Sequence, residues 1–196
     1  MKTRQILAGM LAASLLLLGA CAGQKGPATT AIGAAETALA GLKDDAARYL
    51  PDELKGAQDT LGALRNSLDK GDYKAVIAGA PALMGNLETL KTHVGAKLEE
   101  AKVAAGEWTS YASDLPKMFG AIQGRVATLS SAKSLPKGMD AATLDTARSG
   151  LASMQSAWDD ATAAFTGGNA IDAVAKARSV KAMGEELLKL LGTKAG

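Results

Sequence analysis

The chain has 196 residues, of which 47% are hydrophobic and 4% aromatic, and 22 Lys and Arg residues are set against 20 Asp and Glu residues. A single cysteine excludes an intramolecular disulfide, and one histidine with one cysteine excludes a metal site of clustered His and Cys ligands. The charge is nearly balanced, and no run of basic residues is interleaved with aromatics, so nucleic acid is not an expected partner.

The first twenty-one residues have the three-part layout of a secretory signal. Lys2 and Arg4 give a positive start, residues 6–18 are uncharged and mostly apolar, and two small residues precede Cys21. A helix over 6–18 would rise only about 20 Å, short of the roughly 30 Å of a bilayer core, so this segment is not expected to span a membrane.

The ending Leu18-Gly19-Ala20-Cys21 resembles the lipobox of bacterial lipoproteins, with Gly19 where Ala or Ser is usual. The resemblance implies that residues 1–20 are a signal peptide cut before Cys21, whose sulfur then carries diacylglycerol and whose amino group is acylated, for example with palmitate. A cysteine carrying two or three acyl chains in total stays in the membrane essentially permanently. No cofactor is expected apart from this covalent lipid on Cys21.

The residue after Cys21 indicates the membrane in which the lipoprotein is expected to be anchored. Ala22 follows it, where aspartate would imply retention in the inner membrane, so the resemblance implies the periplasmic face of the outer membrane of a Gram-negative host. Cleavage also removes Lys2 and Arg4, and the mature chain then has 20 basic and 20 acidic residues.

Residues 21–30, which are small and polar, are expected to be a lipidated tether, followed by a helical bundle over 31–196. Periodic apolar residues, interrupted by Pro, Gly and loop sequences, predict an all-α fold with six helices. Pro81 is expected to kink the third helix or shift its start, and Pro116 to open the fourth. The predicted helices cover about 31–49, 51–69, 73–114, 115–129, 141–165 and 170–191.

The two halves of the mature chain resemble each other. Apolar positions match at offsets of 87, 90 and 97 residues in successive helices, and Gly71 aligns with Gly168. The pattern predicts an antiparallel bundle of two three-helix repeats, 31–97 and 115–192, with 98–114 as a connector. Whether the repeats form one bundle or two stays open.

Glycine is frequent inside the predicted helices, at a cost of about 1 kcal/mol each relative to alanine. Either close helix approach or a bundle that opens would account for it. The mid-helix glycines are Gly33, Gly41, Gly56, Gly62, Gly85, Gly95, Gly106, Gly120, Gly124, Gly150 and Gly184.

Reactive groups are scarce. His93, the sole histidine, flanks the apolar seam of a predicted helix, where a solvated or boundary side chain is expected. The adjacent acidic pairs 44–45, 99–100 and 159–160 point about 100° apart on a helix and cannot share a proton. No catalytic residues are expected, and the chain is not predicted to be an enzyme.

A second group of residues consists of methionines and aromatic residues, which have large apolar side chains. Such a set is more often plain core, and the sharper hypothesis is the lining of an apolar ligand site, because methionine adapts its shape and aromatic faces accept flat molecules. The candidate lining is Met84, Trp108, Tyr111, Met118, Phe119, Met154, Trp158, Phe165 and Met183.

Two functions follow as alternatives. The first is a lipid-tethered module that binds or ferries a lipid- or sterol-like molecule; in plan it is similar to accessory proteins of bacterial envelope lipid and sterol transport, although no motif carries that likeness. The second is a protein-interaction scaffold or adaptor for an envelope complex or the cell wall.

Overall fold

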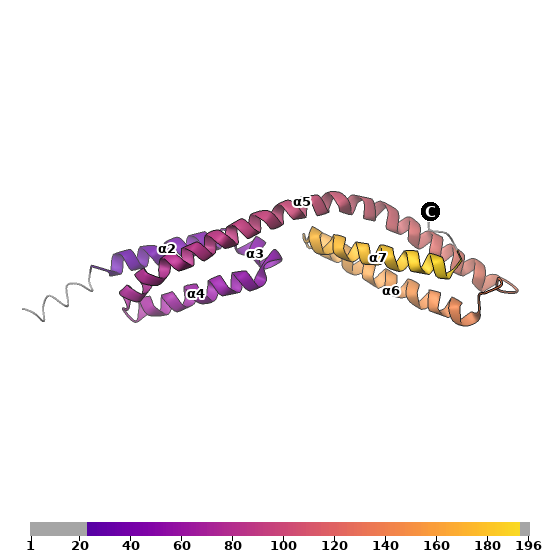
Figure 1. The fold of residues 1–196 in the computed structure, drawn as a ribbon, viewed down its shortest axis with the longest axis horizontal. Helices are drawn as coiled ribbons and strands as arrows, with labels where there is room; N and C mark the ends of the chain where they lie inside the picture. The colour runs from indigo at the N-terminus through magenta and orange to yellow at the C-terminus, as the bar shows by residue number, and fades with distance from the viewer. Residues whose placement is uncertain (1–22, 193–196) are drawn as a thin grey trace, which may run out of the picture. The chain divides into compact units, whose positions relative to one another are not determined.

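The computed structural model describes residues 23–192. They form helices and no strands, which confirms the all-α prediction (Figure 1). The helices are α2 (Lys25–Ala40), α3 (Lys43–Tyr49), α4 (Pro51–Asp69), α5 (Tyr73–Ser131), α6 (Ala141–Thr166) and α7 (Ala170–Leu190).

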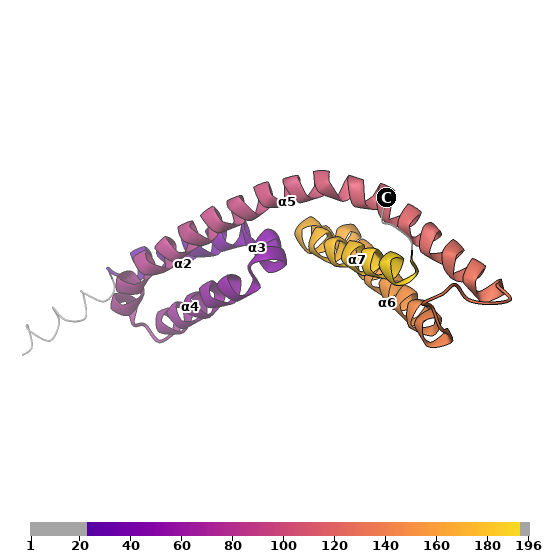
Figure 2. The ribbon, with the colours of Figure 1, turned by 45° about the vertical axis from the view of Figure 1, so that its right-hand side comes forward.

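The chain divides into two compact units, which we call unit 1 (residues 23–97 of the described chain) and unit 2 (98–192). In unit 1, α2 and the first part of α5 run in one direction and α4 runs antiparallel to them (Figures 1 and 2). In unit 2, the later part of α5 and α7 run in one direction and α6 in the other (Figure 2).

The N-terminal boundary of the bundle differs from the prediction. The first described helix begins at Lys25, so residues 25–30 are helix rather than tether. Ala28 is fully buried, and burying it gives this polar segment a reason to be helical. The helix predicted over 31–49 is also divided, since α2 ends at Ala40 and α3 begins at Lys43.

The predicted break at Pro116 is wrong, because α5 continues from Tyr73 to Ser131 through both Pro81 and Pro116. An interior proline costs about 3 kcal/mol, and a fully buried large apolar side chain contributes about 1.5–3 kcal/mol. Leu115 and Ile122, on either side of Pro116, are 1% and 0% exposed, and their burial offsets the cost of the proline.

Residues 98–114, the predicted connector between the repeats, are a continuous part of α5. They belong to unit 2, and Ala104 and Trp108 lie in the core of that unit, each 7% exposed. The remainder of this core comes mainly from α6 and α7, which contribute the fully buried Met154 and Val180. Leu191, in the turn after α7, is fully buried as well. Unit 1 buries a separate set: Ala28, Ile32, Ala35, Leu39, Ala46, Leu54, Ala57, Leu61, Val76, Ala80, Leu83, Leu87, Leu90 and Val94.

The turns between α4 and α5 and between α6 and α7 have the same geometry. Gly71 and Gly168 lie 97 positions apart and have φ values of 77° and 82°. The next residues, Asp72 and Asn169, each donate their N–H to the carbonyl five residues earlier, at 2.8 and 2.9 Å. Their side chains accept the N–H three residues later, at 3.1 Å in both turns. Each turn therefore ends one helix and caps the next.

Gly41, expected inside a helix, is instead the C-cap residue of α2, and the other mid-helix glycines fall into two groups. At Gly79, Gly150 and Gly184, a Cβ would come within 2.8 Å of a side chain from another helix, so close approach accounts for glycine there. The other mid-helix positions have nothing within 4 Å of such a Cβ: Gly33, Gly56, Gly62, Gly85, Gly95, Gly106, Gly120 and Gly124.

Candidate functional site

Three aromatic rings form a stack in unit 2. Trp108 of α5 is parallel to Trp158 within 10° at a centroid distance of 5.1 Å, and to Phe165 within 9° at 4.7 Å. Trp158 and Phe165 are seven residues apart on α6, which is about 10 Å of rise, so they contact opposite faces of Trp108. Both faces of this indole are therefore covered by other rings.

The predicted lining residues are brought together only in part. Eight of the nine belong to the core of unit 2, where Trp108, Phe119 and Met154 are buried and the others are partly buried around them. Met84 lies in unit 1 and is 39% exposed. The predicted lipidation site, Cys21, lies outside the described residues.

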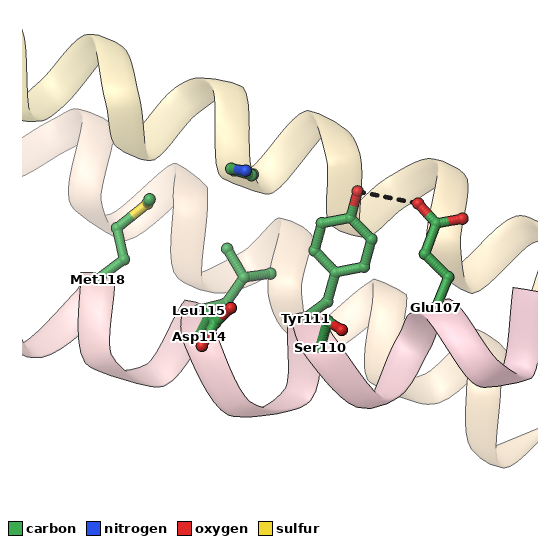
Figure 3. Close-up of a pocket in the computed structure, with 7 residues that line it drawn as sticks. Glu107, Ser110, Tyr111, Asp114, Leu115 and Met118 are labelled. Carbon is green, nitrogen blue, oxygen red and sulfur yellow. Dashed lines mark hydrogen bonds between the residues drawn. The ribbon is translucent and has the colours of Figure 1, made fainter. Parts of the chain in front are cut away.

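A shallow hollow of about 220 Å³ lies between α5 and α7 in unit 2 (Figure 3). Leu115 and Met118 give it an apolar side. The Tyr111 hydroxyl donates to Glu107 Oε1 at 3.3 Å, the bond drawn in Figure 3. The complete lining is Glu107, Ser110, Tyr111, Asp114, Leu115, Met118 and Lys181.

A bidentate ion pair lies beside this hollow. Arg178 Nη2 donates to Glu107 Oε2 at 2.6 Å, and Arg178 Nε donates to Oε1 at 3.2 Å. The guanidinium holds the pKa of the Glu107 carboxyl below its usual value, and the carboxylate raises the pKa of Arg178. This pair joins α5 to α7 across 71 residues, and no local sequence pattern could have indicated it.

Two further hollows are mainly apolar. In unit 1, a hollow of about 350 Å³ lies between the end of α2 and α5, with Met84 on its α5 side. Its lining is Thr37, Ala38, Gly41, Leu42, Met84, Leu87, Glu88 and Lys91. In unit 2, a hollow of about 320 Å³ lies between α6 and α7 and is lined by Thr146, Gly150, Met183, Glu186, Leu187 and Leu190.

His93 lies at the surface, as expected. Its Nδ1 is 2.8 Å from Glu53 Oε2, and the two side chains are 50% and 42% exposed. Among residues 23–192, no three acidic or histidine side chains come together in a way that could hold a metal ion. The helices of this part of the chain include none long and apolar enough to cross a membrane.

Comparisons with known proteins add no relative. No protein-family model matches the chain, and neither the curated proteins nor the solved structures contain a match.

Proposed function

We propose that this protein is a lipid-anchored, non-catalytic adaptor of the bacterial envelope, which works by binding other proteins through the outer faces of its helices. The observation that carries the proposal is the stack of Trp108 between Trp158 and Phe165. A flat apolar ligand needs a free aromatic face, and both faces of the central ring are taken by the core. These three rings, which belong to candidate lining residues, are thus used for packing.

Anchoring through Cys21 fits the position of the first described helix. Cys21 and Lys25, where α2 begins, are four residues apart, which is at most about 14 Å of extended chain. An acylated Cys21 would therefore hold unit 1 next to the bilayer surface. In a Gram-negative host we propose the periplasmic face of the outer membrane, as the residues after Cys21 suggest.

The anchor is tested in the native host. Wild-type protein should incorporate radiolabelled palmitate and fractionate with membranes, whereas Cys21→Ser should do neither. Ala22→Ser, which leaves the cysteine in place, is the matched control and should behave as wild type. A wild-type protein that retains residues 1–20 and a free thiol would refute the anchor.

The adaptor is tested against the carrier in one preparation. A photo-crosslinking amino acid is placed at Val103, which is 73% exposed, and at the buried Met154 as the control. Envelope proteins should be captured from the exposed site alone. The same protein is examined by native mass spectrometry.

The carrier remains the second candidate, because Met183, Leu187 and Leu190 leave an apolar hollow open at the surface of unit 2. A lipid retained by the native protein, together with a thermal shift on adding lipid extract, would favour the carrier over the adaptor.

A further inference from the structure

Unit 1 has an apolar strip on the exposed face of α5. Ile77 and Met84 are 38% and 39% exposed, and the exposed Pro81 lies between them. Spacings of four and three residues place all three on one side of the helix. Large apolar side chains on one exposed face mark an interaction site more strongly than scattered ones.

Helix α2 extends this strip sideways with small residues. Ala38 of α2 and Met84 of α5 line the same hollow, and Leu42 lies beside them. Ala34 and Ala31 are on the same side of α2 as Ala38, one and two turns earlier respectively. Small side chains there would let another helix approach closely.

Unit 2 shows that a three-helix unit does not require this strip. The turns at Gly71 and Gly168 are equivalent, so each residue of α5 in unit 1 corresponds to the residue of α7 that lies 97 positions later. The counterparts of Ile77, Pro81 and Met84 are Val174, Arg178 and Lys181. Val174 is 3% exposed, and Arg178 is paired with Glu107. The apolar side chains in unit 1 are thus available for a contact outside the unit.

The charges at the two ends of the strip identify the partner. Lys74 and Glu88 lie seven residues before and after Pro81 on the same side of α5. The Lys74 ammonium makes no ion pair with a described residue, and Glu88 is 71% exposed with a long 3.4 Å contact to Lys91. The strip therefore has a cation at one end and an exposed anion at the other.

We propose that this strip binds the same strip of a second copy of the chain, with the two α5 helices antiparallel about a two-fold axis at Pro81. Lys74 of each copy then faces Glu88 of the other, and Ile77 faces Met84. A two-fold contact needs a surface that is complementary to itself, and this one is, in both charge and apolarity. A parallel pairing would instead place Lys74 against Lys74. The contact does not depend on the lipid.

The first test uses the full mature chain with Cys21→Ser, studied by sedimentation equilibrium. This protein should dimerise, and either Lys74→Glu or Glu88→Lys should weaken dimerisation by about tenfold, because each places like charges opposite each other twice. The double variant Lys74→Glu/Glu88→Lys should restore the wild-type affinity. Circular dichroism checks that each variant keeps its helix content.

The second test fixes the direction of pairing. In the same background, an equal mixture of the Lys74→Cys and Glu88→Cys proteins should oxidise mainly to the mixed dimer. Pro81→Cys, at the axis, should crosslink to itself, and Val103→Cys, which is exposed but off the strip, should not.

A protein that stays monomeric up to its solubility limit would overturn the proposal. So would charge reversals without effect, or self-crosslinking of Lys74→Cys in preference to the mixed product. Capture of a different envelope protein at position 81 by a monomeric chain would reassign the strip to that protein.

Discussion

The sulfur of Met118 occupies the space in which a side chain at Gly184 would begin, so α5 and α7 meet at a glycine in unit 2. A Cβ there would also lie 2.8 Å from Met154 Cε, and Met154 is fully buried. Glycine at this position therefore serves packing rather than flexibility.

Gly184→Ala should destabilise the protein by about 1–3 kcal/mol through overpacking, despite the better helix propensity of alanine. Gly120→Ala is the matched control, since nothing lies within 4 Å of its Cβ, and it should stabilise by up to about 1 kcal/mol. Urea unfolding followed by circular dichroism measures both. Equal effects at the two positions would contradict the close contact.

Trp108→Ala should cost about 3–5 kcal/mol, because it empties the middle of the aromatic stack. Val103→Ala, one and a half turns away and 73% exposed, should change stability by less than about 0.5 kcal/mol. Thermal unfolding of both variants gives the comparison. A small loss at Trp108, combined with loss of a bound lipid, would return this residue to a ligand site.

The pair of Glu107 and Arg178 makes stability depend on pH in a definite direction. The pKa of Glu107 is lowered from its ordinary value of 4.5, so the folded state favours the carboxylate. The stabilisation is present above the ordinary pKa and is lost as the pH falls through the lowered one.

Arg178→Gln should remove part of this dependence and return the Glu107 pKa toward 4.5. Carboxyl titration by NMR measures the pKa, and urea midpoints across the acid range measure the stability. Lys181→Gln, on the same helix and without a bond to Glu107, is the control. An unchanged Glu107 pKa in Arg178→Gln would show that the ion pair is not its cause.

Gly71 and Gly168, in the two hairpin turns, should be harder to replace by alanine than a glycine with helical φ. Gly71→Ala and Gly168→Ala place a Cβ on a left-handed backbone, with φ of 77° and 82°, and each should cost about 1–2 kcal/mol. Gly62→Ala, within α4 and with open space around it, should instead be neutral or stabilising. Differential scanning calorimetry of the three variants tests this difference.

The sequence predicted that the chain is helical, but it did not predict which residues of the two halves are equivalent. Both glycine turns were predicted, and they set a spacing of 97 residues between the hairpins. The apolar pattern instead aligned the second helix of each half at an offset of 90 residues. The two offsets differ by seven residues, and a shift of seven residues, or two helical turns, leaves such a pattern almost unchanged. Hydrogen bonds in the turns distinguish the two registers, and periodicity does not.

Pro116 shows the other limit of local sequence. A proline after a leucine was interpreted as a helix start, but the burial of Leu115 and Ile122 keeps α5 intact. Residues 98–114 looked like a connector because their apolar pattern is weak, yet Trp108 draws them into unit 2. In both places the structure depends on burial against other helices, which the local apolar pattern of the sequence does not show.

The position of the aromatic stack allows the unfolding of unit 2 to be followed separately by tryptophan fluorescence. Both tryptophans of the protein stand in it, and hence in unit 2, while unit 1 has tyrosines alone. Indole emission during denaturation therefore follows unit 2, whereas the far-ultraviolet signal follows the helices of both. Two melting curves that fail to superimpose would mean that the halves of this molecule lose their structure separately.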